Sequence, residues 1–171
     1  MFKSNKQRIL TYIVFSIYLF LLTWLVLFKL SVNIDQIIQM NFRSINLIPF
    51  YESTIVNGKV LVSEIIFNIL VFVPLGVYIC ILKPNQFILY KIMSIFMVSF
   101  VYEFTQFVIA IGASDITDLI GNTLGGVLGI GLFYIIQKLF KQKSISVVNG
   151  IGFVIEVIAF CLIIFLAIVN R

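Results

Sequence analysis

The stretch GASDITDLIGNTLGG, residues 112–126, places polar side chains at the start of a long apolar segment. Asp115, Asp118 and Asn122 are spaced by three and four residues, which puts them on one stripe of an α-helix. Glycines follow, and the segment stays apolar over a length that can cross a bilayer. The stretch therefore predicts a membrane helix with two carboxylates and an amide at its mouth.

Composition places the whole chain in a membrane. Of the 171 residues, 61% are apolar and 11% are charged, and the mean hydropathy is +1.15. Soluble domains are about 45–50% apolar with about a quarter of their residues charged, so a soluble chain could not bury this much apolar surface. We expect one all-α domain, residues 1–171, built as a polytopic helical bundle in the cell membrane. The chain has no histidine, which excludes histidine-based hydrolases and histidine metal ligands.

Five apolar segments are bounded by charges and turn residues, and each is long enough to span about 30 Å of hydrocarbon. They cover roughly Ile9–Phe28, Ile65–Leu82, Phe87–Ile111, Ile116–Leu139 and Ile151–Val169. The basic residues are spread among the segment ends and are not clustered, which argues against a nucleic-acid partner. Their distribution is instead explained by the positive-inside rule for membrane proteins. With a cytoplasmic N-terminus, most of the twelve basic residues lie inside, namely Lys3, Lys6, Arg8, Lys83, Lys91, Lys138, Lys141 and Lys143. The sequence thus predicts an N-terminus inside and a C-terminus outside.

The first outer connection, from about Lys29 to Ser63, is too apolar for an ordinary hydrophilic loop. The letters SVNIDQIIQMNF, residues 31–42, have apolar residues at helical spacing, and INLIPF, residues 45–50, is apolar around Pro49. Such a connection predicts a short amphipathic helix in the membrane interface, or a partial dip into the membrane. The alternative is a poorly ordered loop, but long apolar loops exposed to water are unusual.

Polar side chains of three segments converge at one depth under this topology. Glu64 and Asn68 lie four residues apart at the outer end of the second segment. Glu103 and Gln106 lie three apart in the outer half of the third, close to the mouth of the fourth. Each carboxylate at membrane depth costs something like 2.5–3.5 kcal/mol, which favours a working site over chance placement. We therefore expect an outward-facing acidic pocket.

Each residue of this pocket has an expected role. Glu103 and Asp118 are the candidates for a catalytic base or a metal ligand. The expected substrate-binding residues are Glu64, Asn68, Gln106, Asp115, Asn122 and Arg43. Gathered carboxylates need shared protons or a cation, which could be Arg43, Lys59 or a hard metal ion such as Mg²⁺ or Ca²⁺. The competing interpretation is structural: Asp115 and Asp118 cap the fourth helix, and the other polar groups are interhelical hydrogen-bond partners.

Gly121, Gly125 and Gly129 recur every four residues and form a small-residue face on the fourth segment. Such a face lets another helix approach closely, which would close the floor beneath the polar groups. The sequence leaves the partner of this face open. It could be the second segment, the third segment, or a second copy of the chain in a homo-oligomer.

Four motifs in series resemble the signature blocks of VanZ-like membrane proteins. They are INLIPF (45–50), SEIIFNILVFVPLG (63–76), EFTQF (103–107) and DITDLIGNTLGGVLG (115–129), within a core of about residues 46–131. The resemblance points to Asn46, Pro49, Glu64, Asn68, Pro74, Gly76, Glu103, Gln106, Asp115, Asp118, Asn122 and Gly125. Its polar members coincide with the pocket expected from the topology. Many members of that family carry an arginine three residues before Asp115, where this chain has Gly112, so another cation or protonation state must balance the carboxylates here.

The resembled family is named for its association with teicoplanin resistance in Gram-positive bacteria, which implies reduced susceptibility to glycopeptide antibiotics of that kind. Three functions stay open. The first is binding or modification of an envelope lipid or a lipid-linked cell-wall precursor from the outer leaflet. The second is a small proton- or ion-coupled transporter, because carboxylates inside spans mark proton and ion paths. The third is an interaction protein that binds another membrane protein through its glycine face, and whether the chain is an enzyme also stays open.

Overall fold

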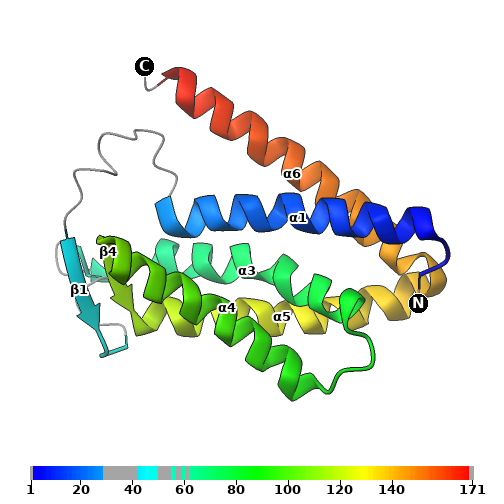
Figure 1. Ribbon diagram of the computed structural model, residues 1–171, viewed down its shortest axis with the longest axis horizontal. Coiled ribbons are helices and arrows are strands. Elements are labelled where there is room, and N and C mark those ends of the chain that lie inside the picture. Colours follow the sequence, from blue (N-terminus) through cyan, green and yellow to red (C-terminus); the bar gives the residue numbers. More distant parts are fainter. Residues whose placement is uncertain (1, 29–41, 50–54, 57–58, 61, 170–171) are drawn as a thin grey trace.

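The computed structural model describes residues 2–28, 42–49, 55–56, 59–60 and 62–169 (Figure 1). The helices are α1 (Asn5–Phe28), α3 (Val62–Leu82), α4 (Ile88–Ile109), α5 (Ile116–Phe140) and α6 (Ser144–Val169), with a 3₁₀ turn, η1 (Lys141–Lys143), between the last two. The strands are β1 (Phe42–Asn46), β2 (Ile55–Val56), β3 (Lys59–Val60) and β4 (Ile111–Asp115). The expected helical bundle is confirmed. The five helices among the described residues coincide with the five apolar segments, although α6 begins at Ser144 rather than at Ile151.

Length and composition make these helices membrane spans. In the described part of the chain, four helical runs are long and apolar enough to cross a membrane: α1, α3, α4, and a run from Ile116 to Phe165 that contains α5, η1 and most of α6. Lys141 interrupts the last run, because its backbone has φ 48° and ψ −117°. Figure 1 shows α6 turning back from the end of α5. The chain is a multi-pass membrane protein, and its orientation relative to the cytoplasm stays a prediction.

Successive helices run in opposite directions, so the bundle has two ends (Figure 1). At one end α1 and α4 finish, α3 and α5 start, and β1 lies beside β4; we call this the strand end. The opposite end, the turn end, holds η1 and the connection between α3 and α4. The helices thereby bring the polar ends of three predicted segments together at the strand end.

Helices α3 and α5 pack most closely, and glycine makes this possible. A Cβ atom added at Gly125 would overlap the carbonyl oxygen of Ile69, and one added at Gly129 would overlap that of Val73. A Cβ at Gly121 would come within 3.7 Å of α3 as well. The predicted small-residue face is therefore present, and its partner is α3 of the same chain. Of the partners that the sequence left open, the structure thus has the second segment on this face.

A pair of parallel strands at the strand end was not expected from the sequence. β1 pairs with β4, with Asn46 opposite Asp115. The sequence predicts helix as far as Ile111, but α4 ends at Ile109, and Ala110 adopts a left-handed conformation with φ 60° that turns the chain into β4. The paired residues lie 69 positions apart, so no local pattern reveals the pairing.

Most described residues of the outer connection lie in short strands, apart from a bend and a turn at residues 47–49. β2 and β3 form a second, antiparallel pair with Ile55 opposite Val60. The amphipathic helix predicted for residues 31–42 lies outside the described residues, apart from Phe42 at the start of β1. The interfacial position expected for this connection stays a prediction.

Apolar side chains fill the bundle and also cover its outside. The buried core draws on every helix, for example through Leu22, Phe72, Ile95, Phe133 and Val148. The outward faces carry large apolar side chains that are more than half exposed, among them Phe20, Phe104 and Phe165. A surface of this kind suits contact with lipid chains, because exposing so much apolar surface to water would cost free energy.

Candidate functional site

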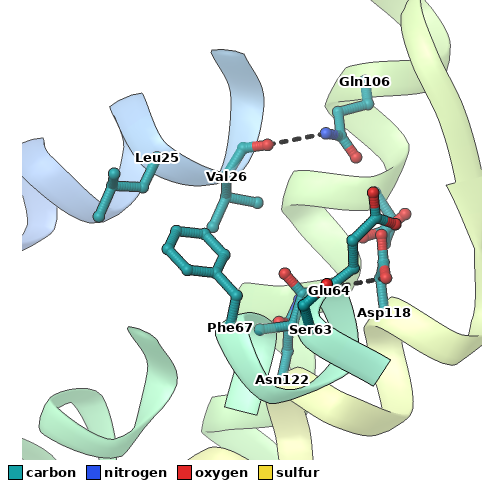
Figure 2. A pocket seen from close by; sticks show the side chains of 10 residues that line it. Leu25, Val26, Ser63, Glu64, Phe67, Gln106, Asp118 and Asn122 are labelled. Atoms are coloured by element: carbon teal, nitrogen blue, oxygen red, sulfur yellow. Dashed lines mark hydrogen bonds between the residues drawn. The ribbon is translucent and has the colours of Figure 1, made fainter. Parts of the chain in front are cut away.

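A polar pocket opens between the helices at the strand end (Figure 2). Its volume is about 340 Å³, and side chains of α1, α3, α4 and α5 line it. The lining residues are Leu25, Val26, Ser63, Glu64, Phe67, Asn68, Glu103, Gln106, Asp118 and Asn122. We call this the acidic pocket. The structure brings six of the sequence-predicted site residues together in it, namely Glu64, Asn68, Glu103, Gln106, Asp118 and Asn122.

Asp118 connects α5 to α3 across the acidic pocket. The amide of Asn68 donates a hydrogen bond of 2.6 Å to its Oδ1 atom. Figure 2 shows the Glu64 side chain, one turn earlier on α3, extending toward the same carboxylate. Asp118 is not the cap of its helix, because Asp115 holds that position. Two carboxylates thus lie on this side of the acidic pocket.

Glu103 is the most deeply buried carboxylate of the acidic pocket, with 6% of its surface exposed. Its Oε2 atom accepts the backbone N–H of Asp115 at 3.0 Å, and its carbonyl oxygen accepts the hydroxyl of Ser114 at 2.6 Å. Both bonds tie α4 to the end of β4. The carboxylate is therefore held in one place before any ligand arrives, which is what a preorganised binding or catalytic group requires.

Asp115 lies beside the acidic pocket and does not line it. Its Oδ1 atom accepts the backbone N–H of Thr117 at 2.8 Å, which makes Asp115 the N-cap of α5. Its Oδ2 atom accepts the side-chain amide of Asn46 at 3.3 Å. The capping interpretation thus describes Asp115, and its carboxylate joins β1 to the start of α5.

Two amide side chains present acceptor atoms in the acidic pocket. Gln106 donates to the backbone carbonyl of Val26 at 2.9 Å, and Asn122 donates to the hydroxyl of Ser99 at 3.0 Å. Within the described part of the chain, the Oε1 atom of Gln106 and the Oδ1 atom of Asn122 have no hydrogen-bond partner. Buried polar atoms are normally paired, so these oxygens favour a ligand that donates hydrogen bonds.

The acidic pocket therefore offers acceptors rather than donors of charge-assisted bonds. No lysine or arginine is among the described residues that line it. Ammonium, hydroxyl and amide N–H groups can bond to carboxylate and amide oxygens, whereas a bare phosphate would be repelled. The described lining residues are therefore suited to a ligand that donates hydrogen bonds.

For Arg43 and Lys59, the two cationic residues expected near the carboxylates, the structure describes only the backbone. Arg43 lies in β1 opposite Gly112 of β4, and Lys59 lies in β3, while both side chains lie outside the described residues. The register thus sets the backbone of Arg43 beside the position where many members of the resembled family carry arginine. Of the residues that the structure describes, no three His, Cys, Asp or Glu side chains form a group that could hold a metal ion.

Sequence reasoning missed Ser99 and the contribution of α1. Ser99 precedes Glu103 by four residues, so it lies on the same face of α4, and that spacing is the signal that would have found it. Val26 takes part through a backbone carbonyl, which no side-chain pattern can indicate. Leu25 and Phe67 line the pocket as apolar residues, and nothing distinguishes them from other apolar residues of a span.

Comparison with known proteins identifies a matching family and a similar protein. The sequence profile described as VanZ/LLP1 matches residues 15–137, which include every residue that lines the acidic pocket. "Protein VanZ" of Enterococcus faecium is 37% identical over 139 residues, and the match covers 81% of this chain and 83% of that protein. No solved structure matches the chain. Family profile and relative agree over most of the sequence, and the chain therefore belongs to the VanZ/LLP1 family.

Proposed function

We propose that the acidic pocket binds the polar head of an envelope lipid or of a lipid-linked cell-wall precursor. This binding lowers the susceptibility of the cell to teicoplanin-like lipoglycopeptides, the phenotype associated with the family. The observation that carries the proposal is an acceptor-rich pocket that adjoins an apolar groove. A polar head and an apolar chain on one molecule match these two surfaces.

The apolar groove lies next to the acidic pocket and has a volume of about 300 Å³. Its lining includes Leu47 after β1, Phe100 and Phe104 of α4, and Leu119 of α5. The rings of Phe100 and Phe104 are stacked with their centroids 6.4 Å apart, which forms a continuous aromatic surface. Glu103 lines both the groove and the pocket. A lipid chain in the groove would therefore bring its head group to the carboxylates.

The head group that suits the pocket carries hydrogen-bond donors. Sugars and peptides attached to membrane lipids present hydroxyl, amide and ammonium groups, and all of these donate to carboxylate oxygens. An ammonium group between Glu64 and Asp118 would gain the most, because two negative charges face it. If the bound molecule is also modified, Glu103 or Asp118 would act as the general base.

Antibiotic susceptibility in a Gram-positive host tests the proposal. The host expresses the wild-type protein or Asp118→Asn at matched membrane levels, and teicoplanin is measured with vancomycin alongside. Asparagine keeps the size of the side chain but removes the charge that faces Glu64, so we expect most of the protection to be lost. Ser94→Ala is the matched control, because Ser94 is exposed on α4 and its hydroxyl bonds only within its own helix.

The outcomes separate the site from the phenotype. Protection by wild type and Ser94→Ala, but not by Asp118→Asn, supports a working acidic pocket. Equal protection by all three contradicts the assignment of the site. If the wild-type protein itself gives no protection, resistance is not the role of this member, and its envelope lipids should be profiled instead.

A small proton- or ion-coupled transporter is the second candidate function. Glu103 and Glu156 are both buried inside the bundle, and carboxylates within spans mark proton or ion paths. The acidic pocket lies at one end of the bundle, whereas transporter sites usually lie near the membrane midplane. Protection that disappears when the proton gradient is dissipated, at constant membrane levels of the protein, would favour transport over binding.

A further inference from the structure

A second polar site lies inside the bundle and shares no lining residue with the acidic pocket. Glu156 of α6 has 5% of its surface exposed, and Tyr78 of α3 has 2%. Within the described chain, both carboxylate oxygens of Glu156 and the hydroxyl of Tyr78 have no hydrogen-bond partner. Such groups are nearly always paired in a protein interior, so three unpaired oxygens in one place call for a ligand.

Both side chains line a cavity of about 140 Å³ between α1, α3, α5 and α6. The one other titratable side chain among its described lining residues is Tyr18 of α1, whose hydroxyl donates to the carbonyl of Val71 at 2.8 Å. The faces that α5 and α3 otherwise turn to the cavity are apolar, and no lysine, arginine or second carboxylate is among the described residues that line it. Glu156 has no counter-charge there.

Glu156 lies in the middle of a membrane helix. In the sequence it stands near the cytoplasmic start of the fifth predicted segment, where a carboxylate can reach water. The structure begins α6 at Ser144, so about 18 Å of helix precede Glu156. Its neighbours Ile155 and Val157 are exposed, whereas Glu156 is buried. A carboxylate at this depth cannot reach the interface easily.

Gly152 of α6 leaves space beside the Tyr78 hydroxyl. A Cβ atom added at Gly152 would lie 2.5 Å from the hydroxyl of Tyr78 and 3.2 Å from Cγ1 of Val14. Gly152 therefore gives the tyrosine hydroxyl the room that it occupies. Glu156 follows Gly152 by four residues, so both lie on the face of α6 that is turned to α3.

The number of oxygens decides which ligand the cavity can take. Ca²⁺ takes about 6–8 oxygen ligands and Mg²⁺ needs a near-ideal octahedron, whereas the described residues that line this cavity have three unpaired oxygens, all of them almost inaccessible. A proton needs one oxygen, and it removes the large cost of a buried, unpaired charge. We infer that Glu156 is the proton-binding group of a second, intramembrane site, with the Tyr78 hydroxyl in the same cavity. The site shares no lining residue with the acidic pocket.

Infrared difference spectroscopy between acidic and alkaline pH tests this inference on the full chain in lipid nanodiscs. We expect a protonated-carboxyl C=O band that disappears as the pH rises and that is missing in Glu156→Gln. Tyr78→Phe should shift the frequency of this band and the pH at which it disappears, because it removes a polar neighbour in the cavity. Glu64→Gln should leave the band in place, since Glu64 belongs to the acidic pocket.

A second readout uses the unaltered protein. Dicyclohexylcarbodiimide is a hydrophobic reagent that reacts with protonated carboxyl groups inside membranes, and peptide mass spectrometry locates the adduct. We expect the adduct on Glu156, with less of it at alkaline pH. A carboxyl signal that is identical in wild type and Glu156→Gln, a Glu156-dependent band that does not change with pH, or adducts on other carboxyl groups with none on Glu156 would each overturn the inference.

Discussion

At the scale of single residues, two aspartates three positions apart have different tasks. Asp115 bonds to Thr117 and Asn46 within the chain, whereas Asp118 faces the acidic pocket and accepts from Asn68. Spacing alone groups the aspartates on one helical stripe. They differ because α5 begins at the residue after Asp115, which leaves Asp115 on extended backbone with φ −120° and ψ 126°. The start of the helix, and not the residue type, assigns the cap.

The role of Asp115 as the N-cap of α5 leads to a prediction about stability. Asp115→Ala removes the acceptor for the N–H of Thr117, so we expect the free energy of unfolding to fall by about 1 kcal/mol. Asp115→Asn keeps a capping oxygen and should retain most of that free energy. Denaturant unfolding in detergent micelles, followed by circular dichroism, measures both variants. An equal loss in both would show that the negative charge, rather than the cap, stabilises this end of α5.

At the scale of helices and strands, the central contact between α3 and α5 depends on bare backbone. Gly125→Ala would place a methyl group against the carbonyl of Ile69, so the two helices would have to separate. Overpacking of this kind typically costs about 1–3 kcal/mol. We expect Gly125→Ala to lower the thermal stability of the purified protein. It should also change the geometry of the acidic pocket, because both helices line it.

Gly131 provides the matched control for this prediction. It lies in the same helix, and a Cβ atom there would meet nothing within 4 Å. Gly131→Ala should therefore be neutral or stabilising by up to about 1 kcal/mol, because alanine favours helix more than glycine does. Comparable destabilisation by both variants would mean that the glycines act through backbone flexibility and not through close packing.

Hydropathy and helical spacing predicted the helices and six of the pocket residues, because both signals are local. The start of α6 was missed because polar residues there resemble a loop, yet Asn149 is buried and donates to the hydroxyl of Thr11 at 2.8 Å. The β1–β4 pair was missed because its residues are far apart in the chain. The side-chain oxygens of Gln106 and Asn122 lack a hydrogen-bond partner among the described residues. This could not be predicted from the sequence, because it depends on which groups the folded chain brings near them.

At the scale of the whole molecule, the two ends of the bundle differ in chemistry. The strand end holds the acidic pocket, whereas Lys138, Lys141 and Lys143 gather around η1 at the turn end. The positive-inside rule would put the turn end in the cytoplasm and the acidic pocket at the outer leaflet. The proposed function depends on this orientation, because teicoplanin-like antibiotics act on the outside of the cell.

Cysteine labelling tests the orientation. Cys80 and Cys161 are first replaced by serine or alanine, and then Ser63→Cys or Gln142→Cys is introduced, one at each end of the bundle. Both positions are exposed, so a membrane-impermeant maleimide can reach them wherever they face water. We expect Ser63→Cys to be labelled in intact cells and Gln142→Cys only after permeabilisation. The reverse pattern would turn the acidic pocket toward the cytoplasm, and its ligand would then have to come from the inner leaflet, before the precursor is exported.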